Sequence, residues 1–145
     1  MEKGFDPIPT AEGWQLSNAP VLSMAAHKAS LDIFEEAGMN NLIAKSKLLS
    51  GYLHFILNDI NSKKKEKLIE IITPAIEEER GCQVSILLLN KGKEVFNELS
   101  NQGVIADWRE PDVIRVAPVP LYNSFEEVWR FGNIIETLFK SVNND

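Results

Sequence analysis

The sequence holds few residues of the types that usually build a catalytic or metal centre. It has one cysteine and two histidines among 145 residues. A single thiol cannot close an internal disulfide, so we expect a reducing, cytoplasmic compartment. Cys82 comes just ahead of an apolar run, and we expect it to be a small buried strand residue rather than a nucleophile.

The two histidines lie far apart, on two different predicted helices. We therefore expect no metal pair and no bound metal. We expect His27 on the surface and His54 half-buried, with the hydrogen bonds of its ring satisfied. The sequence also lacks a glycine-rich phosphate loop, an HExxH pair, a CxxC pair and a GxSxG elbow, so no familiar motif names an activity.

Positive charge and long apolar runs are scarce as well. The formal net charge is −6, which argues against nucleic acid or an anionic membrane as the main partner. No apolar run approaches the roughly 20 residues of a membrane span, and the amino terminus has no signal-peptide pattern. The glutamate run at 77–79 is typical of a solvated turn, and these glutamates are the obvious neighbours of Arg80.

The residues that are present are typical of one globular domain. Hydrophobic residues make up 44% of the chain and charged residues 25%, which is enough for a core. Residues 1–20 carry three prolines and two glycines without periodicity, so we expect a connector there. We place the small domain itself at residues 21–145.

Apolar periodicity predicts the secondary structure. Ser17 or Asn18 can cap a first helix that Gly38 ends, and Ser124 and Glu127 form a capping box for the last helix. The predicted helices cover residues 17–38, 39–60, 91–103 and 124–138, and the predicted strands cover 68–74, 82–89, 104–108 and 112–118. The sum is an α+β fold with a small, mainly antiparallel sheet of about four strands covered by helices.

Arg115 interrupts an otherwise apolar strand, DVIRVAP. A permanently charged guanidinium is costly to bury without an anion. Strand alternation puts Arg115 on the face opposite Ile114. One interpretation is an ion pair within the protein, to Asp107, Glu110 or Asp112. The other is a guanidinium fork presented to a substrate carboxylate.

Asn18 leaves a similar choice open. Its side chain can cap the first helix, or its short amide can donate to a phosphate at the helix start.

Several strings of the chain, in this order, are similar to the carboxy-terminal part of kynureninases. They include GWQLSNAPVL, AAHKASLDIFEEAGM, LLSGYLHFIL, EERGCQVSI and GVIADWREPDVIRVAPVPLYNSFEEVWRF. The resemblance extends from about Gly4 to Phe139, and RVAPVPLYNSF and ERGCQ are specific strings.

The resemblance implies the C-terminal domain of a pyridoxal 5'-phosphate enzyme of the aspartate-aminotransferase fold type (fold type I). Kynureninases hydrolyse kynurenine or 3-hydroxykynurenine to an anthranilate and alanine in tryptophan catabolism, and act as homodimers. Matched position by position, Arg115 falls on the arginine that grips the substrate α-carboxylate. Asn18 falls on an asparagine beside the cofactor and the aromatic end of the substrate.

The large domain of such enzymes is missing from this sequence, together with the lysine that holds the cofactor as a Schiff base. We therefore expect this chain alone to be inactive, with the large domain of the same chain as its absent partner. Two alternatives remain: the small domain of another lyase or aminotransferase of this fold type, and a stand-alone binding module. The string APVPLYNSF argues against the first.

Overall fold

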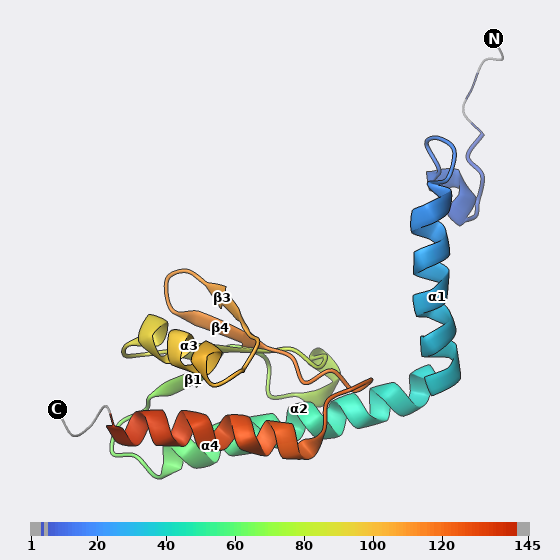
Figure 1. The fold of residues 1–145 in the computed structure, drawn as a ribbon. Coiled ribbons are helices and arrows are strands. Elements are labelled where there is room, and N and C mark those ends of the chain that lie inside the picture. The colour runs from blue at the N-terminus through green and yellow to red at the C-terminus, as the bar shows by residue number, and fades with distance from the viewer. Residues whose placement is uncertain (1–3, 5, 142–145) are drawn as a thin grey trace. The chain divides into compact units, whose positions relative to one another are not determined.

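The computed structural model describes residue 4 and residues 6–141 (Figure 1). The chain divides into two compact units, Met1–Gly38 and Met39–Asp145. The second unit holds the sheet and the hydrophobic core. The boundary after residue 20 that we expected from composition stays a prediction.

The first unit contains a short 3-10 helix, η1 (Ala11–Trp14), and the helix α1 (Val21–Ala37). Helix α1 ends as predicted at Gly38, whose φ is 77° and whose N–H donates to the Phe34 carbonyl at 3.0 Å. This left-handed backbone favours glycine. Taken by itself, α1 buries none of its residues.

The predicted capping of α1 by Ser17 or Asn18 is wrong. Pro20 occupies the N-cap position with φ −73°, and no side chain caps the helix. The Pro20 carbonyl accepts the N–H of Met24 at 2.9 Å, the first bond of the helix. Because a side-chain cap comes from the N-cap residue itself, Asn18 lies two residues too early in the chain.

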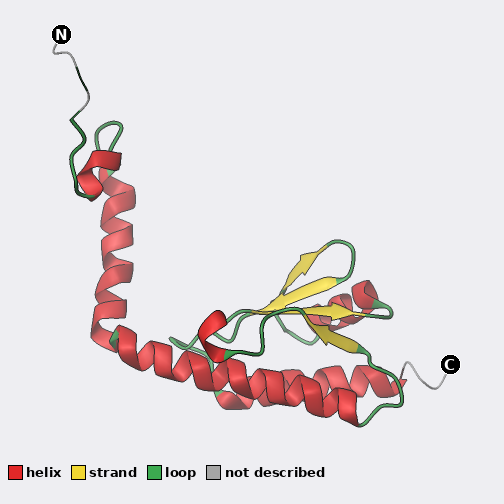
Figure 2. Cartoon of the chain, turned by 180° about the vertical axis from the view of Figure 1, so that it is seen from behind, coloured by secondary structure: helices red, strands yellow, loops and turns green. Residues whose placement is uncertain are grey.

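The second unit combines helices with a small sheet. Its helices are α2 (Met39–Ser62), α3 (Gly92–Asn101), α4 (Phe125–Ser141) and the 3-10 helix η2 (Glu77–Glu79). Its strands are β1 (Ile69–Ile71), β2 (Val84–Leu88), β3 (Asp107–Arg109) and β4 (Val113–Val116). They form one antiparallel sheet in the order β1-β2-β4-β3. Figure 2 shows the strands in yellow. The predicted α+β fold is therefore confirmed.

One face of this sheet is covered by the helices of the unit. Along β2, Val84, Ile86 and Leu88 are buried, whereas Ser85 and Leu87 are only partly buried. The buried strand residues form one core with residues of α2, α3 and α4, so all three helices pack on the same face. We call the other side the open face. Its residues are Glu70, Ser85, Leu87, Asp107, Arg109, Val113 and Arg115.

Helix α4 begins with the predicted capping box. The Ser124 N–H donates to Glu127 Oε2 at 2.7 Å, and the Glu127 N–H donates to the Ser124 hydroxyl at 3.3 Å. Helix α4 then lies along α2 (Figure 1). A Cβ at Gly132 would lie 2.4 Å from Ile56 Cγ2, so a larger residue does not fit at this contact without displacement.

Candidate functional site

The open face carries a row of three polar residues across the middle of the sheet. The register pairs Ser85 of β2 with Arg115 of β4, and Arg115 with Asp107 of β3. Directly opposed residues on antiparallel strands project to the same face. Arg115 therefore lies between a hydroxyl group and a carboxylate, while its chain neighbours Ile114 and Val116 are buried in the core, as predicted.

Arg115 forms an ion pair with Asp107. Its Nε donates to Asp107 Oδ2 at 2.5 Å, and its Nη2 contacts the same oxygen. Arg109 Nε also donates to that oxygen, at 2.9 Å. Of the carboxylates considered from the sequence, Asp107 is thus the partner. Glu110 instead accepts a hydrogen bond from Trp108 Nε1 at 2.8 Å.

The cluster of Asp107, Arg109 and Arg115 is electropositive and reachable. The Arg115 side chain is 33% exposed and that of Asp107 47%. The hydrogen bond from Arg115 holds the pKa of Asp107 below its usual range; partial burial opposes this effect, and Arg109 adds to it. One carboxylate between two guanidinium groups leaves a net positive charge. Such a cluster can bind a further carboxylate.

The ion pair explains how the charge of Arg115 is balanced in this chain, and the role of Arg115 toward a substrate stays a prediction. Asn18 lies exposed in the first unit, ahead of α1. Its capping role is excluded, and its role beside a cofactor stays a prediction as well.

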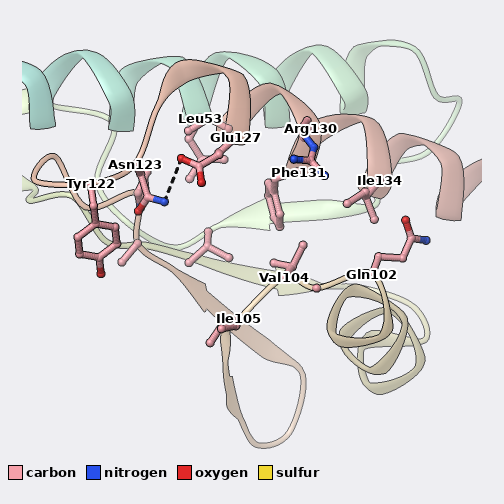
Figure 3. Close-up of a pocket in the computed structure, with 15 residues that line it drawn as sticks. Leu53, Gln102, Val104, Ile105, Tyr122, Asn123, Glu127, Arg130, Phe131 and Ile134 are labelled. Atoms are coloured by element: carbon pink, nitrogen blue, oxygen red, sulfur yellow. Dashed lines mark hydrogen bonds between the residues drawn. The ribbon is translucent and has the colours of Figure 1, made fainter.

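A pocket of about 550 Å³ opens on the helix side of the sheet, between α4 and the loops after α3 and β4 (Figure 3). Leu53 and Phe131 belong to its apolar wall, and Glu127 and Arg130 are its charged lining residues. Arg115 does not line it, so the pocket and the charged row are separate features. No sequence pattern predicted this pocket, because it needs the loop after α3 to meet α4 and the segment just before it.

His54 is more buried than predicted. The residue is 8% exposed, and its Nε2 has no hydrogen-bond partner among the described residues. Burial, and secondly the positive charge of Arg80, lower the pKa of the ring. The prediction of a half-buried, satisfied ring is therefore wrong. The reason is helical spacing, since Ser50, His54 and Leu57 share the inward face of α2.

Arg80 packs against α2 rather than against the neighbouring glutamates. Its Nε donates to Ser50 Oγ at 3.4 Å, and its Nη1 donates to the Ala75 carbonyl. Glu77 pairs with Lys47 at 2.9 Å instead. The glutamate run itself is the exposed helix η2, in agreement with the predicted solvated turn.

The other cysteine and histidine predictions have opposite outcomes. Cys82 is a partly exposed free thiol, and β2 begins only at Val84, so the predicted buried strand residue is wrong. His27 is exposed, as predicted.

Residues 4 and 6–141 contain no group of three or more histidines, cysteines or carboxylates arranged to hold a metal ion. Among the described residues, none of the helices has a stretch of apolar residues that could span a membrane.

Neither the two lysines with a shifted pKa nor the pocket beside α4 fits a pyridoxal-phosphate site by itself. A lysine that forms a Schiff base is activated by a lowered pKa. Lys47 and Lys63 are shifted the other way, because hydrogen bonds to Glu77 and Asp59 raise their pKa values. The pocket beside α4 has no lysine in its lining, and Arg130 is the single cation among its described lining residues. These two lysines and this pocket therefore do not supply the lysine and phosphate ligands of such a cofactor.

The fold and the charged row define a small α+β domain with a paired arginine on the open face of an antiparallel sheet. Residues 42–135 match the model of the family described as kynureninase C-terminal domain. The chain belongs to this family, and the resemblance stated from the sequence is confirmed.

Similar proteins agree with this assignment. A kynureninase of Christiangramia forsetii is 51% identical over 136 residues, which cover 94% of this chain and 32% of that protein. A kynureninase of Flavobacterium johnsoniae is 52% identical over 136 residues, which cover 94% of this chain and 32% of that protein. A kynureninase of Mus musculus is 44% identical over 145 residues, which cover 97% of this chain and 31% of that protein. The chain thus spans about a third of the length of these curated relatives.

Proposed function

We propose that this chain is the carboxy-terminal domain of an enzyme that hydrolyses L-kynurenine or 3-hydroxykynurenine to the corresponding anthranilate and L-alanine. The observation that carries the proposal is 44–52% identity, over nearly the whole chain, to proteins named kynureninase. The reaction consumes one water. The Cβ–Cγ bond breaks, the hydroxyl group goes to the carbonyl carbon, and the proton goes to Cβ of alanine.

In this proposal Arg115 binds the α-carboxylate of the substrate. Its position in RVAPVPLYNSF, its exposure of 33% and the net positive charge of its cluster support this role. A carboxylate bound by the planar fork is held in a fixed orientation, which places the rest of the substrate. The two substrates differ only at the aromatic ring, so Arg115 serves both equally.

Pyridoxal phosphate is the cofactor of the proposed enzyme and supplies the electron sink for breaking the carbon–carbon bond. The Schiff-base lysine and most phosphate ligands belong to the large domain of the same chain, and the proposed enzyme is a cytoplasmic homodimer. Asn18 lies beside the cofactor in this proposal. Because no side chain caps α1, Asn18 is not tied to a helix-capping role.

The test of the function starts with the coding sequence upstream of Met1. If the reading frame continues through a large domain, we expect the complete protein with pyridoxal phosphate to release anthranilate and alanine from kynurenine in equal amounts. Failure of the complete, cofactor-loaded protein to cleave either substrate would contradict the proposal. A genuine stop codon ahead of Met1 would favour a stand-alone module instead.

A second test uses the 145-residue chain alone. Titration with pyridoxal phosphate should give no stoichiometric long-wavelength absorbance band, and no single lysine should be trapped by borohydride. A stoichiometric band on one lysine would contradict the expectation that this chain lacks the cofactor lysine.

Asn18 has its own test, because its two possible roles affect different quantities. Asn18→Ala should leave the melting temperature of this chain unchanged and lower activity or cofactor affinity of the complete enzyme. Ser17→Ala is the neighbouring control. A lowered melting temperature with normal kinetics would return Asn18 to a structural role.

A further inference from the structure

The geometry of the Arg115 guanidinium is asymmetric. Both of its contacts with Asp107 run through Nε and Nη2, which form one edge of the planar group. A guanidinium has a second edge, formed by Nη1 and Nη2, that can also bind a carboxylate in bidentate fashion. Among the hydrogen bonds and ion pairs of the described residues, none involves Nη1 of Arg115. Because Nη2 carries two hydrogens, Nη1 and the Nη2 hydrogen that points away from Asp107 can still bind a ligand.

Asp107 is itself held in place by the strands. It lies directly opposite Arg115 in the β3–β4 register, so its carboxylate lies on the same face of the sheet and beside the Arg115 side chain. Arg109 Nε donates to the same Oδ2 at 2.9 Å, which restrains the carboxylate from a second side. Arg115 thus has a fixed partner on one edge, although its long side chain would otherwise sample many rotamers.

We propose that Asp107 is a positioning residue, which holds the Nε–Nη2 edge of Arg115 so that the Nη1–Nη2 edge faces the substrate carboxylate. The inference rests on the proposed function, because Arg115 must first be the carboxylate-binding residue. Asp107 uses one of its oxygens for this purpose, and it does not neutralise the cluster because Arg109 shares that oxygen. The charge needed to attract the substrate is therefore retained.

The same ion pair could instead make Asp107 a competitor of the substrate for Arg115. If Asp107 competed with the substrate for Arg115, removing its charge would free the guanidinium and tighten substrate binding. Positioning and competition thus predict opposite changes of KM.

The experiment compares two acid-to-amide variants in the same hairpin of the complete enzyme. Asp107→Asn removes the charge that holds Arg115, and Glu110→Gln removes a carboxylate that contacts Trp108 Nε1 instead. Because a misplacement of about 1 Å can cost about 100-fold, we expect Asp107→Asn to raise the KM for kynurenine by about 10- to 100-fold. The value of kcat should change much less, since a contact made equally in ground and transition states acts on KM.

Asp107→Glu keeps the negative charge on a longer stem and should recover part of the loss. Glu110→Gln should behave like wild type. A lower KM in Asp107→Asn, or a KM equal to that of Glu110→Gln, would overturn the positioning role while leaving the proposed function intact. An inactive wild-type enzyme would overturn the proposed function and this inference together.

A second measurement does not depend on activity. In the 15N-labelled chain, the Arg115 Nε–Hε resonance should be protected from solvent exchange by its bond to Asp107. Asp107→Asn should shift this resonance and speed its exchange, whereas Glu110→Gln should not. An unchanged resonance in Asp107→Asn would mean that the pair does not hold Arg115 in solution, and would overturn the inference.

Discussion

Ile114 and Arg115 are neighbours in sequence and belong to opposite faces of the sheet. Ile114 is fully buried among residues of β2, β3 and the helices. Arg115 lies on the open face, a third exposed, in an ion pair that water can reach. Burial of an aliphatic side chain contributes substantially to stability, whereas a solvated ion pair contributes little. Because alternate residues of a strand point to opposite faces, the residues that stabilise the fold and the candidate binding residue lie on different sides of the same strand.

The separation has a consequence for function. A residue that adds little to stability can be selected for binding without loss of the fold, and its neighbour can stabilise the strand that carries it. The contrast between the two faces is tested best by changing a buried residue and an open-face residue of the same strand. The free energy of unfolding and kcat/KM are then measured for each variant.

The largest effect is expected for Arg115→Ala in the complete enzyme. The relevant pair is Arg115 with the substrate carboxylate, which is desolvated in the complex. Truncating one partner of such a pair typically costs about 2–5 kcal/mol. Since each 1.4 kcal/mol is about tenfold, kcat/KM should fall by roughly 30-fold to several thousand-fold. The melting temperature should barely move.

Arg115→Lys should recover only part of the activity, because an ammonium keeps the charge and loses the planar fork. A destabilised Arg115→Ala protein with normal kcat/KM would show that the arginine serves only its ion pair with Asp107, and the contrast between the faces would fail at its central residue.

Ile114→Ala should give the reverse pattern. It empties a fully buried site in the centre of the core, and such truncations cost about 2–5 kcal/mol of unfolding free energy. Chemical denaturation of this chain measures that loss. In the complete enzyme at a permissive temperature, the KM of the folded fraction should remain near wild type. A normal denaturation midpoint would mean that Ile114 is not the core residue described above.

A smaller effect is expected where the helix layer is most tightly packed. Gly132→Ala would bring a Cβ to 2.4 Å from Ile56 Cγ2. Overpacking costs about 1–3 kcal/mol, and alanine regains up to about 1 kcal/mol of helix propensity. We expect a net loss of up to about 2 kcal/mol in unfolding free energy.

The loss should disappear in an Ile56→Ala background, where the clashing methyl group is gone. Gly81→Ala is the matched control, because a Cβ there would meet nothing within 4 Å. If both glycine variants unfold alike, the close contact of α2 and α4 does not limit the size of residue 132.

Local interactions explain which parts could be predicted from the sequence. The Ser124–Glu127 capping box and the Gly38 stop depend on residues within one helical turn, and both are present. The choice of Asp107 as the partner of Arg115 depends on which strands pair and in which register. The sequence narrowed the partner of Arg115 to three carboxylates. The alternation of side chains has a period of two residues, so it does not distinguish pairings that differ by two residues.

The errors have equally specific causes. The predicted cap of α1 failed because the helix begins after Pro20 rather than before it. The strand predicted at Cys82 begins two residues later, at Val84, which is the usual uncertainty of an element boundary. The inward position of His54 was missed because a polar residue within an apolar helix face gives no signal of its own.

The packed side of the domain and its open face should respond to pH in different ranges, because His54 and Asp107 are lowered from different ordinary pKa values. Burial lowers the pKa of His54, while the unfolded chain keeps a histidine pKa of about 6.5. Below that value the unfolded state binds more protons than the folded state, so stability should fall as the pH falls from 7 to 5. One proton limits the slope to about 1.4 kcal/mol per pH unit. Asp107 has a lowered pKa, and its contribution should be lost only at more acid pH.

His54→Gln should flatten the dependence of unfolding free energy between pH 7 and 5, whereas Asp107→Asn should change it only at acid pH. His27→Gln is the control, since His27 is exposed on α1. Urea denaturation at closely spaced pH values measures all three. An unchanged slope in His54→Gln would place the neutral-range titration elsewhere, and a slope changed by Asp107→Asn between pH 7 and 5 would mean that the open face is coupled to the core. If neither occurs, the charged row can change its protonation and its ligand without disturbing the packed side of the sheet, which is the property a carboxylate-binding surface on this domain requires.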